Sequence, residues 1–569
     1  MDRTKKEFKA VSMKIAVPLW TAAFLLLIFG LFRISYLWSG DSDNAFLAIT
    51  GNAVLHGNIL LHGYYLSSLV TYFPFDIYLN AVFVKIFGFN MSVIHLAPMA
   101  IFMAFLITSI FLVRNTGDAE SDKKFFSVRV FMIAVFFAMP GRAFAFWILQ
   151  ELHLSSVVMS MLTFMLLEKT AGGIRGGTSF KTFFLVFPVL ILFLMPLFIM
   201  NSGLFIIICI LPVLSASLLY IFLIYKKYEA LGARGAGSKI FAESKPYLLL
   251  ISLTVLSAAI EKIILIEIRK WGGFIAVPSG LPIAFVSMSN LPHNFYLFFN
   301  GILKILGVYF FGKNLFSVAS LFAILKMSGI LVFIYGIVSG LKKIKNPEPE
   351  DFIDLMLLSG VLFLVIAFLF SQMAVSKASA RYLIPVVIFG FLLAFRNIEN
   401  IKFIRRNFMN LKLKIAAAFI FIVYAASFTV NAGAVAPNSP FVPLSRWLEK
   451  HKLTYGYAPY MDAGIITLTS KGRVKVRQVR TNFYMKILPY DWVSKENWYK
   501  KKAFFIIYSK NFIYDYVDMK SAVKTFGKPS EVYTEDFQGT IGRAYGRPDG
   551  RYTMPPYVIL VYKKGIKLK

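Results

Sequence analysis

The sequence contains one cysteine among its 569 residues. Cys209 lies inside an apolar run, so an intrachain disulfide is excluded and the residue is expected to be a small buried hydrophobe. A glycine-rich phosphate loop, a nucleophile elbow and a Walker sequence are also missing, which disfavours an ATP-driven pump. His153, like the other histidines of the apolar part, forms no metal-binding spacing with another histidine, so no zinc site is expected.

Acidic residues are scarce as well: 29 Asp and Glu stand against 61 Lys and Arg, which gives a formal net charge of +32. In a soluble protein this excess would suggest binding to nucleic acid. However, 58% of the residues are hydrophobic and 17% are aromatic, more apolar surface than a soluble interior can hide. The composition therefore indicates a membrane protein with membrane lipid as a partner, and nucleic acid is not expected.

A spanning helix needs about 20 largely apolar residues. The first run of this kind is expected to be a true span rather than a cleaved signal peptide, because it is long, contains Arg33 and lacks a small-residue cleavage site before Asp41. Apolar runs predict a polytopic α-helical protein of about eleven transmembrane helices, near 15–37, 91–113, 128–147, 154–168, 181–199, 203–224, 246–266, 316–340, 352–371, 381–395 and 415–431.

Basic loops set the expected orientation. Their positions alternate correctly with eleven spans, and the positive-inside rule then predicts a cytoplasmic N-terminus and an extracytoplasmic C-terminus. Two segments of the membrane domain 1–436 are long enough to hold structure outside the bilayer, 38–90 and 267–315. The first of these contains two amphipathic stretches, 42–57 and 66–88, of which the second is expected to lie along the interface; the aromatic stretch 295–311 of the other segment is expected there too. The basic segments are 1–14, 114–127, 169–181, 225–245, 341–351 and 396–414.

Residues 437–569 differ in composition, because the long apolar runs stop after Pro437. Alternating apolar and polar residues predict a small soluble α/β domain outside the membrane. Its Asp462, Asp491 and Trp492 are expected in surface turns. Strands are expected at 464–469, 473–479, 504–508 and 557–562, and helices at 444–451 and 517–526.

Ionisable side chains near membrane depth are costly, so they mark candidate functional sites. Acids and bases occur together at the outer ends of the predicted spans. That combination suits a site that handles a phosphate leaving group and a hydroxyl nucleophile. The residues concerned are Arg33, Asp41, Asp43, Asp76, Arg142, Glu151, His153, Glu261, Lys262, Glu267, Lys377 and Arg381.

Asp41-Ser42-Asp43, directly after the first span, is the sharpest local feature. A carboxylate here could take a proton from an acceptor hydroxyl. Alternatively, Asp and Ser are favoured as N-caps for a helix that starts near Asn44. The spacing of Asp41 and Asp43 also suits a divalent cation, although a metal is not the favoured interpretation.

Lys377 and Arg381 are four residues apart at the start of a span. On an α-helix they would share a face, so both could bind one phosphate; the alternative is that they reach out to lipid headgroups. Arg142 and His153 flank a short loop, and Arg142 could form a structural ion pair with Glu151 as readily as serve catalysis.

These features together resemble the GT-C membrane glycosyltransferases, most closely the group of protein mannosyltransferases and lipid A aminoarabinose transferases. The resemblance depends on the order of Asp41-Ser42-Asp43-Asn44-Ala45, then Tyr72-Phe73-Pro74-Phe75-Asp76, then Lys85-Ile86-Phe87-Gly88, and later Arg381-Tyr382-Leu383. Asn44 departs from the usual Asp-Glu-Ala pattern, and Pro74-Phe75-Asp76 from the usual Pro-Pro-Leu. The tail of the chain is similar to that of many bacterial relatives.

The resemblance implies an inverting glycosyltransferase that uses a sugar on a polyprenyl phosphate, at the outer face of a bacterial inner or plasma membrane. Asp43 would deprotonate a hydroxyl on a glycan, lipid or protein acceptor. The departing phosphate would be stabilised by Arg381 and neighbouring cations, of which Lys377 is one. Apart from the resemblance, position at the outer ends of the spans makes five further residues candidates for substrate binding, Arg142, Asp41, Asp76, Glu151 and His153. A monophosphate held by Lys and Arg requires no metal cofactor.

Three other functions stay open. A lipid-linked-glycan flippase or transporter would place ionisable residues near mid-membrane, where Glu261 and Lys262 are the best candidates. An O-antigen polymerase or ligase would also have an outer-face site. A receptor could bind glycan through residues 437–569 while the spans merely anchor it.

Overall fold

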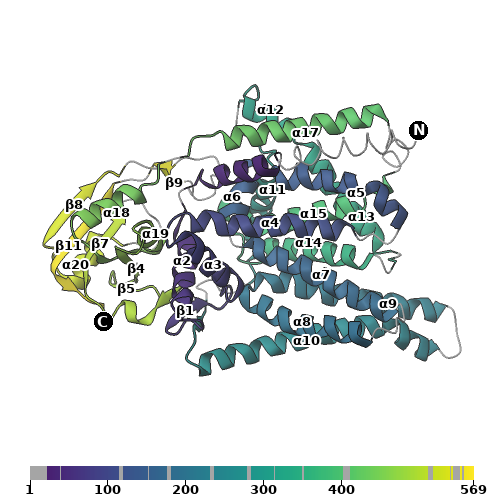
Figure 1. Ribbon diagram of the computed structural model, residues 1–569, viewed down its shortest axis with the longest axis horizontal. Coiled ribbons are helices and arrows are strands. Elements are labelled where there is room, and N and C mark those ends of the chain that lie inside the picture. Colours follow the sequence, from purple (N-terminus) through teal and green to yellow (C-terminus); the bar gives the residue numbers. More distant parts are fainter. Residues whose placement is uncertain are drawn as a thin grey trace, which may run out of the picture.

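A computed structural model describes most of the chain as a helical bundle with a sheet-containing C-terminal domain at one end (Figure 1). That end is called the domain-bearing end below. The description covers residues 22 and 24–568 apart from 39, 115–118, 151–152, 176–180, 231–235, 279–283, 313, 346, 349–350, 402–409, 437, 510–516, 538–539, 542–551 and 554–555.

Eight helices in these residues are long and apolar enough to cross a membrane. A helix of 20 residues is about 30 Å long, the thickness of the hydrocarbon core. The bundle therefore indicates a membrane-embedded protein. The spanning candidates lie in α4 (Val93–Arg114), α7 (His153–Arg175), η2 (Ile206–Ile210) with α9 (Leu211–Ala230), α10 (Ala236–Lys270), α12 (Val318–Leu325) with α13 (Ser328–Lys343), α14 (Phe352–Phe370), η5 (Lys377–Leu383) with α15 (Ile384–Arg396), and α17 (Leu411–Ala432).

Three of the eleven predicted runs differ from these eight. The runs near 15–37 and 181–199 correspond to shorter apolar helices, Phe24–Ser35 and Val186–Asn201; the second lies in α8 (Lys181–Asn201). The run near 128–147 is bent by 84° between its two parts. Pro140 cannot donate a backbone hydrogen bond, so the helix ends there and restarts after Gly141. The count of eleven spans stays a prediction. The bent run comprises α5 (Ala119–Ile133), η1 (Ala134–Ala138) and α6 (Arg142–Gln150).

Two short helices, α2 (Ser42–Leu55) and α3 (Phe75–Phe87), lie between the bundle and the C-terminal domain (Figure 1). They pack backbone against backbone, since a Cβ at Gly51 would lie 2.6 Å from the amide nitrogen of Ala81. The second predicted stretch, 66–88, does not begin as a helix: β1 (Tyr64–Ser67) precedes α3.

β1 joins three distant parts of the chain in one small sheet. It pairs in parallel with β2 (Ile275–Val277) and antiparallel with β6 (Ser494–Lys495). The first two strands come from the two long segments predicted outside the bilayer, and β6 comes from the C-terminal domain. Backbone hydrogen bonds therefore fix the domain against the bundle. Farther along the 267–315 segment, η3 (Met288–Asn290) leads into α11 (Leu291–Ile305).

The C-terminal domain contains a mixed six-stranded sheet in the order β5-β4-β3-β7-β11-β8. β3 pairs in parallel with both of its neighbours and the other pairs are antiparallel. The elements are α18 (Phe441–Lys450), β3 (Tyr455–Pro459), α19 (Tyr460–Thr469), β4 (Lys475–Thr481), β5 (Ile487–Pro489), η7 (Glu496–Trp498), β7 (Ala503–Ser509), α20 (Met519–Phe526), β8 (Glu531–Glu535) and β11 (Tyr557–Ile566), with a separate pair β9 (Thr540–Ile541) and β10 (Tyr552–Thr553).

The strand predicted at 464–469 is wrong, because these residues form the second half of α19. Ile465, Ile466 and Leu468 are all buried, since α19 packs against the domain sheet on one side and α2 on the other. A helix buried on all sides shows no amphipathic period, so its β-branched residues imitate a strand.

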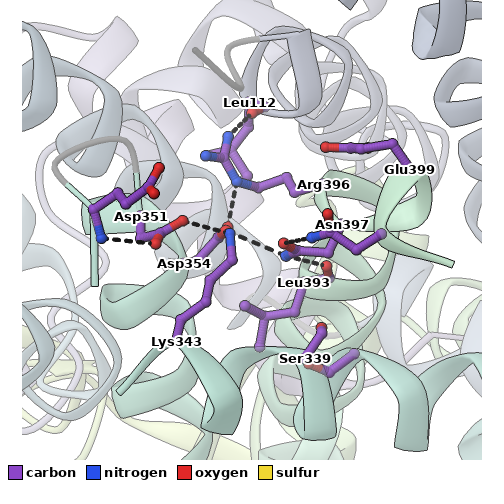
Figure 2. Close-up of polar contacts among 12 residues, drawn as sticks. Leu112, Ser339, Lys343, Asp351, Asp354, Leu393, Arg396, Asn397 and Glu399 are labelled. Carbon is purple, nitrogen blue, oxygen red and sulfur yellow. Dashed lines mark hydrogen bonds and ion pairs between the residues drawn. The ribbon is translucent and has the colours of Figure 1, made fainter. Parts of the chain in front are cut away.

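The end of the bundle remote from the domain contains a buried ionic network centred on Asp354 of α14. Figure 2 shows Arg396 and Lys343 converging on this carboxylate. The Nε of Arg396 lies 2.5 Å from Oδ1 of Asp354, and both side chains are almost fully buried. Lys343 also pairs with Asp351 at 2.6 Å. Three helices, α13, α14 and α15, are thus held together by charge.

Two arginines of this region also satisfy the C-terminal carbonyls of α4. Arg396 donates to the carbonyl oxygen of Leu112 at 2.5 Å, and Arg129 donates to that of Val113 at 3.0 Å. The last carbonyls of a helix have no partner within the helix and favour positive charge. Arg129 in turn pairs with Glu399 at 2.8 Å. The network therefore closes this end of the bundle.

Replacing Arg396 with Met should destabilise the protein by about 3–5 kcal/mol, because Asp354 would stay buried after losing a charged partner. The double variant Arg396→Met with Asp354→Leu should recover most of that loss. Thermal unfolding in detergent measures the stability of the single and the double variant. Lys227→Met is the control, because the ion pair of Lys227 with Glu243 is exposed and should contribute little to stability. Equal stability of the single and double variants would contradict the expectation.

Candidate functional site

Asp41 is the N-cap of α2. Its Oδ1 accepts hydrogen bonds from the amides of Asp43 at 2.9 Å and Asn44 at 3.3 Å. The carboxylate satisfies amides that have no partner within the helix, and it lies at the positive end of the helix dipole. Among the described residues, no group of three or more His, Cys, Asp or Glu could hold a metal ion.

Asp43, in the first turn of α2, contacts the C-terminal domain. Its Oδ1 accepts a hydrogen bond of 2.6 Å from the hydroxyl of Tyr460, the first residue of α19. Burial, followed by the nearby Asp43 carboxylate, raises the pKa of Tyr460 well above its usual value. Tyr460 therefore stays protonated at neutral pH and acts as the donor. The sequence did not reveal this partner, since the two residues are 417 positions apart.

Ser42 strengthens the same contact. Its hydroxyl donates to the carbonyl oxygen of Met461 at 2.9 Å and accepts from the amide of Gly464 at 3.0 Å. A Cβ at Gly464 would lie 3.1 Å from the Ser42 hydroxyl, which is tighter than an ordinary contact. Glycine therefore allows α2 and α19 to approach closely, and this approach brings Tyr460 to Asp43.

Two further aromatic rings surround Tyr460. Trp492 stacks near it with ring centroids 5.2 Å apart, and Tyr490 lies at 5.4 Å. Both are only partly buried.

Three residues of the C-terminal domain were expected in surface turns. Asp491 is exposed and Trp492 is partly buried, but Asp462 is buried and accepts a hydrogen bond of 3.2 Å from Tyr557. The surface prediction for Asp462 is therefore wrong.

Asp76 is buried and connects α3 to the bundle. Its Oδ2 accepts hydrogen bonds from Ser155 at 3.0 Å, at the start of α7, and from Asn201 at 2.8 Å, at the end of α8. Burial raises the pKa of Asp76 to about 6, although both hydrogen bonds oppose the shift. The predicted substrate-binding residue therefore makes a packing contact between three helices.

Arg381 and His153 are brought together through Tyr382. The Arg381 guanidinium lies 4.9 Å from the Tyr382 ring centroid and donates to its hydroxyl at 3.1 Å. The His153 ring lies 5.3 Å from the same ring. His153 and Ser155 both lie at the start of α7. Ser155 contacts Asp76 of α3, and His153 contacts Tyr382, so α7 connects Asp76 to Arg381. Glu151, which was predicted to bind substrate, lies outside the described residues.

Lys377 and Arg381 do not share a face, so that prediction is wrong. Residues Lys377–Leu383 form a 3-10 helix, in which positions four apart diverge by about 120°. Pro385, at the start of α15, has no N–H to donate to the carbonyl of Arg381, so a regular α-helix cannot run back through this segment. Lys377 is exposed, whereas Arg381 is partly buried.

Lys326 is a buried cation that the sequence analysis missed. Its side chain donates to Ser427 at 2.6 Å and lies 5.3 Å from the Tyr424 ring centroid. The Nζ is 3.6 Å from the position that a Cβ would take at Gly141, next to Arg142. A lysine inside the predicted span 316–340 was a visible signal, since charge at membrane depth is costly.

Of the two residues that favoured a transporter, Glu261 is buried and Lys262 is exposed. Lys262 pairs with Glu261 at 3.1 Å. Glu267 pairs with Lys270 at 2.6 Å, and both of these side chains are exposed. An ion pair exposed on both sides, such as Glu267 with Lys270, contributes little energy. Glu261, by contrast, is only 4% exposed on α10, and a buried carboxylate in an apolar helix is the feature that a transporter would use.

Replacing Asp76 with Asn should preserve or raise stability at pH 7.5. The pKa of Asp76 is about 6 in the folded protein, above the ordinary 3.8. As the pH rises from below 3.8 to above 6, the free energy of unfolding of wild type therefore falls by about 3 kcal/mol. Asn keeps an acceptor for Ser155 and Asn201 without that loss. Thermal unfolding at pH 5 and 7.5 should show a smaller pH dependence for Asp76→Asn, while Asp76→Leu is destabilised at both. Equal losses in Asn and Leu variants at pH 7.5 would argue against the assignment.

Comparison with known proteins does not identify a family for this chain. No protein-family model matches the sequence, and no curated protein matches it. Function must therefore be inferred from the residues of this chain and their arrangement at the domain-bearing end.

Proposed function

We propose that the chain is an inverting glycosyltransferase that moves a sugar from a polyprenyl-phosphate donor to a hydroxyl acceptor. One observation carries the proposal: the partly exposed carboxylate of Asp43 is fixed where an apolar bundle meets a polar domain. A lipid-linked donor and a water-soluble acceptor can meet at such a boundary. The resemblance to GT-C enzymes assigns the base to the same residue.

In the proposed reaction, the acceptor oxygen attacks the anomeric carbon of the donor sugar. The bond from that carbon to the phosphate oxygen breaks, and the phosphate leaves with the bonding electrons. Asp43 takes the proton of the acceptor hydroxyl. A single displacement inverts the anomeric centre. Tyr460 holds the carboxylate in position through its hydrogen bond.

Cations at the domain-bearing end would stabilise the departing phosphate. Arg381 is the first candidate, because a guanidinium can bind two phosphate oxygens at once. Arg142 and Lys326 come from the bend at Gly141 and the neighbouring break between α12 and α13. Lys326 is only 4% exposed, and the two contacts described for it are with a hydroxyl and an aromatic ring. An anionic ligand would compensate its buried charge.

A flippase would have to open the opposite end of the bundle to pass a glycan through. There the Asp354 network ties three helices and the end of α4 together. Opening would separate buried charges, at a cost of several kcal/mol for each pair. This favours a transferase that acts at one face.

The test compares Asp43→Asn with Asp41→Asn. Asn caps a helix about as well as Asp, so Asp41→Asn should keep both the fold and turnover. Asp43→Asn should lose about 10²- to 10⁴-fold in rate, the range for removing a general base. Purified proteins are incubated with radiolabelled polyprenyl-phosphate sugars from membranes of the source cells, and release of sugar is followed with and without EDTA.

Each alternative predicts a different result. Equal loss in both variants that is restored by added divalent cation would indicate a metal pair instead of a base. Wild-type turnover in Asp43→Asn would exclude the base assignment. No turnover by wild type, with the same lipids moving between leaflets of liposomes, would replace the transferase with a flippase.

A further inference from the structure

The aromatic residues near Asp43 belong to a turn that is held rigidly in the C-terminal domain. The side chain of Gln478 donates to the carbonyl oxygens of Trp492 and Val493, both at 2.8 Å. The hydroxyl of Tyr499 donates to the carbonyl oxygen of Gln478 at 2.7 Å. Residues 490–493 of this turn lie directly before β6, which pairs with β1. The turn is therefore fixed to both the domain and the membrane part.

Val493 is strained within this turn, with φ of +50°. A β-branched residue at positive φ is a rare outlier that costs about 1–3 kcal/mol and persists only where surrounding contacts enforce it. Strain of this kind is concentrated at ligand-binding sites. Trp492, the residue before Val493, packs against Tyr460, and Tyr460 contacts Asp43.

The turn presents chemistry that suits a sugar ring. Trp492 and Tyr490 are partly exposed aromatic residues, and Asp491 between them is exposed. The Arg480 guanidinium lies 5.8 Å from the Tyr490 ring centroid. A pyranose has an apolar C–H face that stacks on an aromatic ring and an edge of hydroxyls that bond to charged groups. Indole Nε1 of Trp492 is buried and makes no hydrogen bond within the described residues.

We propose that Tyr490, Asp491 and Trp492 form an acceptor platform that binds a sugar ring of the acceptor beside Asp43. The acceptor would then be a glycan, rather than a protein or a simple lipid. This inference rests on the proposed function, and it gives the C-terminal domain a role in substrate selection. Tyr460 links the platform to the base, since its ring packs against Trp492 and its hydroxyl bonds to Asp43.

The test uses the full-length protein and separates binding from turnover. Trp492→Leu removes the flat ring, and Asp491→Ala removes an exposed group whose loss should not disturb folding. Trp271→Leu is the matched control, because Trp271 is 69% exposed at the end of α10, outside the platform. The ligands are size-fractionated oligosaccharides released from the envelope of the source cells, and a Ser/Thr-rich peptide.

Calorimetry should show that wild type and Trp271→Leu bind the oligosaccharides. Trp492→Leu should bind them about tenfold more weakly, as expected for one aromatic contact, and Asp491→Ala severalfold more weakly. In turnover, Trp492→Leu should raise KM for the acceptor by a similar factor. Hydrolysis of the donor by water, measured without acceptor, should stay within twofold of wild type in Trp271→Leu, the variant outside the platform.

Equal oligosaccharide affinity in wild type, Trp492→Leu and Asp491→Ala would overturn the platform. So would a peptide acceptor whose KM is the same in all of them. If wild type neither transfers nor hydrolyses the donor, the proposed function fails, yet the calorimetric comparison still decides whether these residues bind glycan. If Trp492→Leu does not fold, Asp491→Ala provides the same decision.

Discussion

The hydroxyl of Ser42 lies between α2 and α19, and the rest of the candidate site depends on that contact. It donates to one backbone carbonyl of α19 and accepts from a backbone amide one turn away, which fixes both the distance and the rotation of the two helices. A larger side chain at Gly464 would push the helices apart. Because Asp43 follows Ser42 and Tyr460 begins α19, this close approach creates their hydrogen bond. The acidic residue is thus oriented by a domain that is remote in sequence.

The charged side chains at the two ends of the bundle differ in the groups that neutralise them. At the remote end, Arg396, Lys343 and Asp354 neutralise one another within the protein, and arginines cap the carbonyls of α4. At the domain-bearing end, Lys326 is buried against a hydroxyl and a ring. Buried ionic networks hold helices in place, whereas a buried cation whose described contacts are neutral is better suited to a ligand of opposite charge. The remote end is therefore held by ion pairs, whereas the domain-bearing end contains a buried cation whose described contacts are neutral.

Apolar length predicted most of the bundle, because a span of about 20 residues has few alternatives in a bilayer. The bend at Pro140 and Gly141 was also readable in principle, since both residues interrupt helices. Other features could not be read from local pattern. The 3-10 form of Lys377–Leu383 separates two cations expected on one face, and α19 has no polar side to reveal its period. Asp43 was identified as a candidate, but its partner Tyr460 and the nearby Trp492 come together only through tertiary packing.

The small sheet of β2, β1 and β6 has a consequence for how the protein is made. Its central strand is synthesised early, one neighbour follows about 200 residues later, and the other arrives only near residue 494. Chains fold progressively as they emerge from the ribosome, N-terminal parts first. For most of synthesis β1 would therefore expose an unpaired edge, and α2 would lack α19. A chain released before β6 is made would have its membrane helices but no oriented Asp43, so any activity at this site would be withheld until the C-terminal domain has docked.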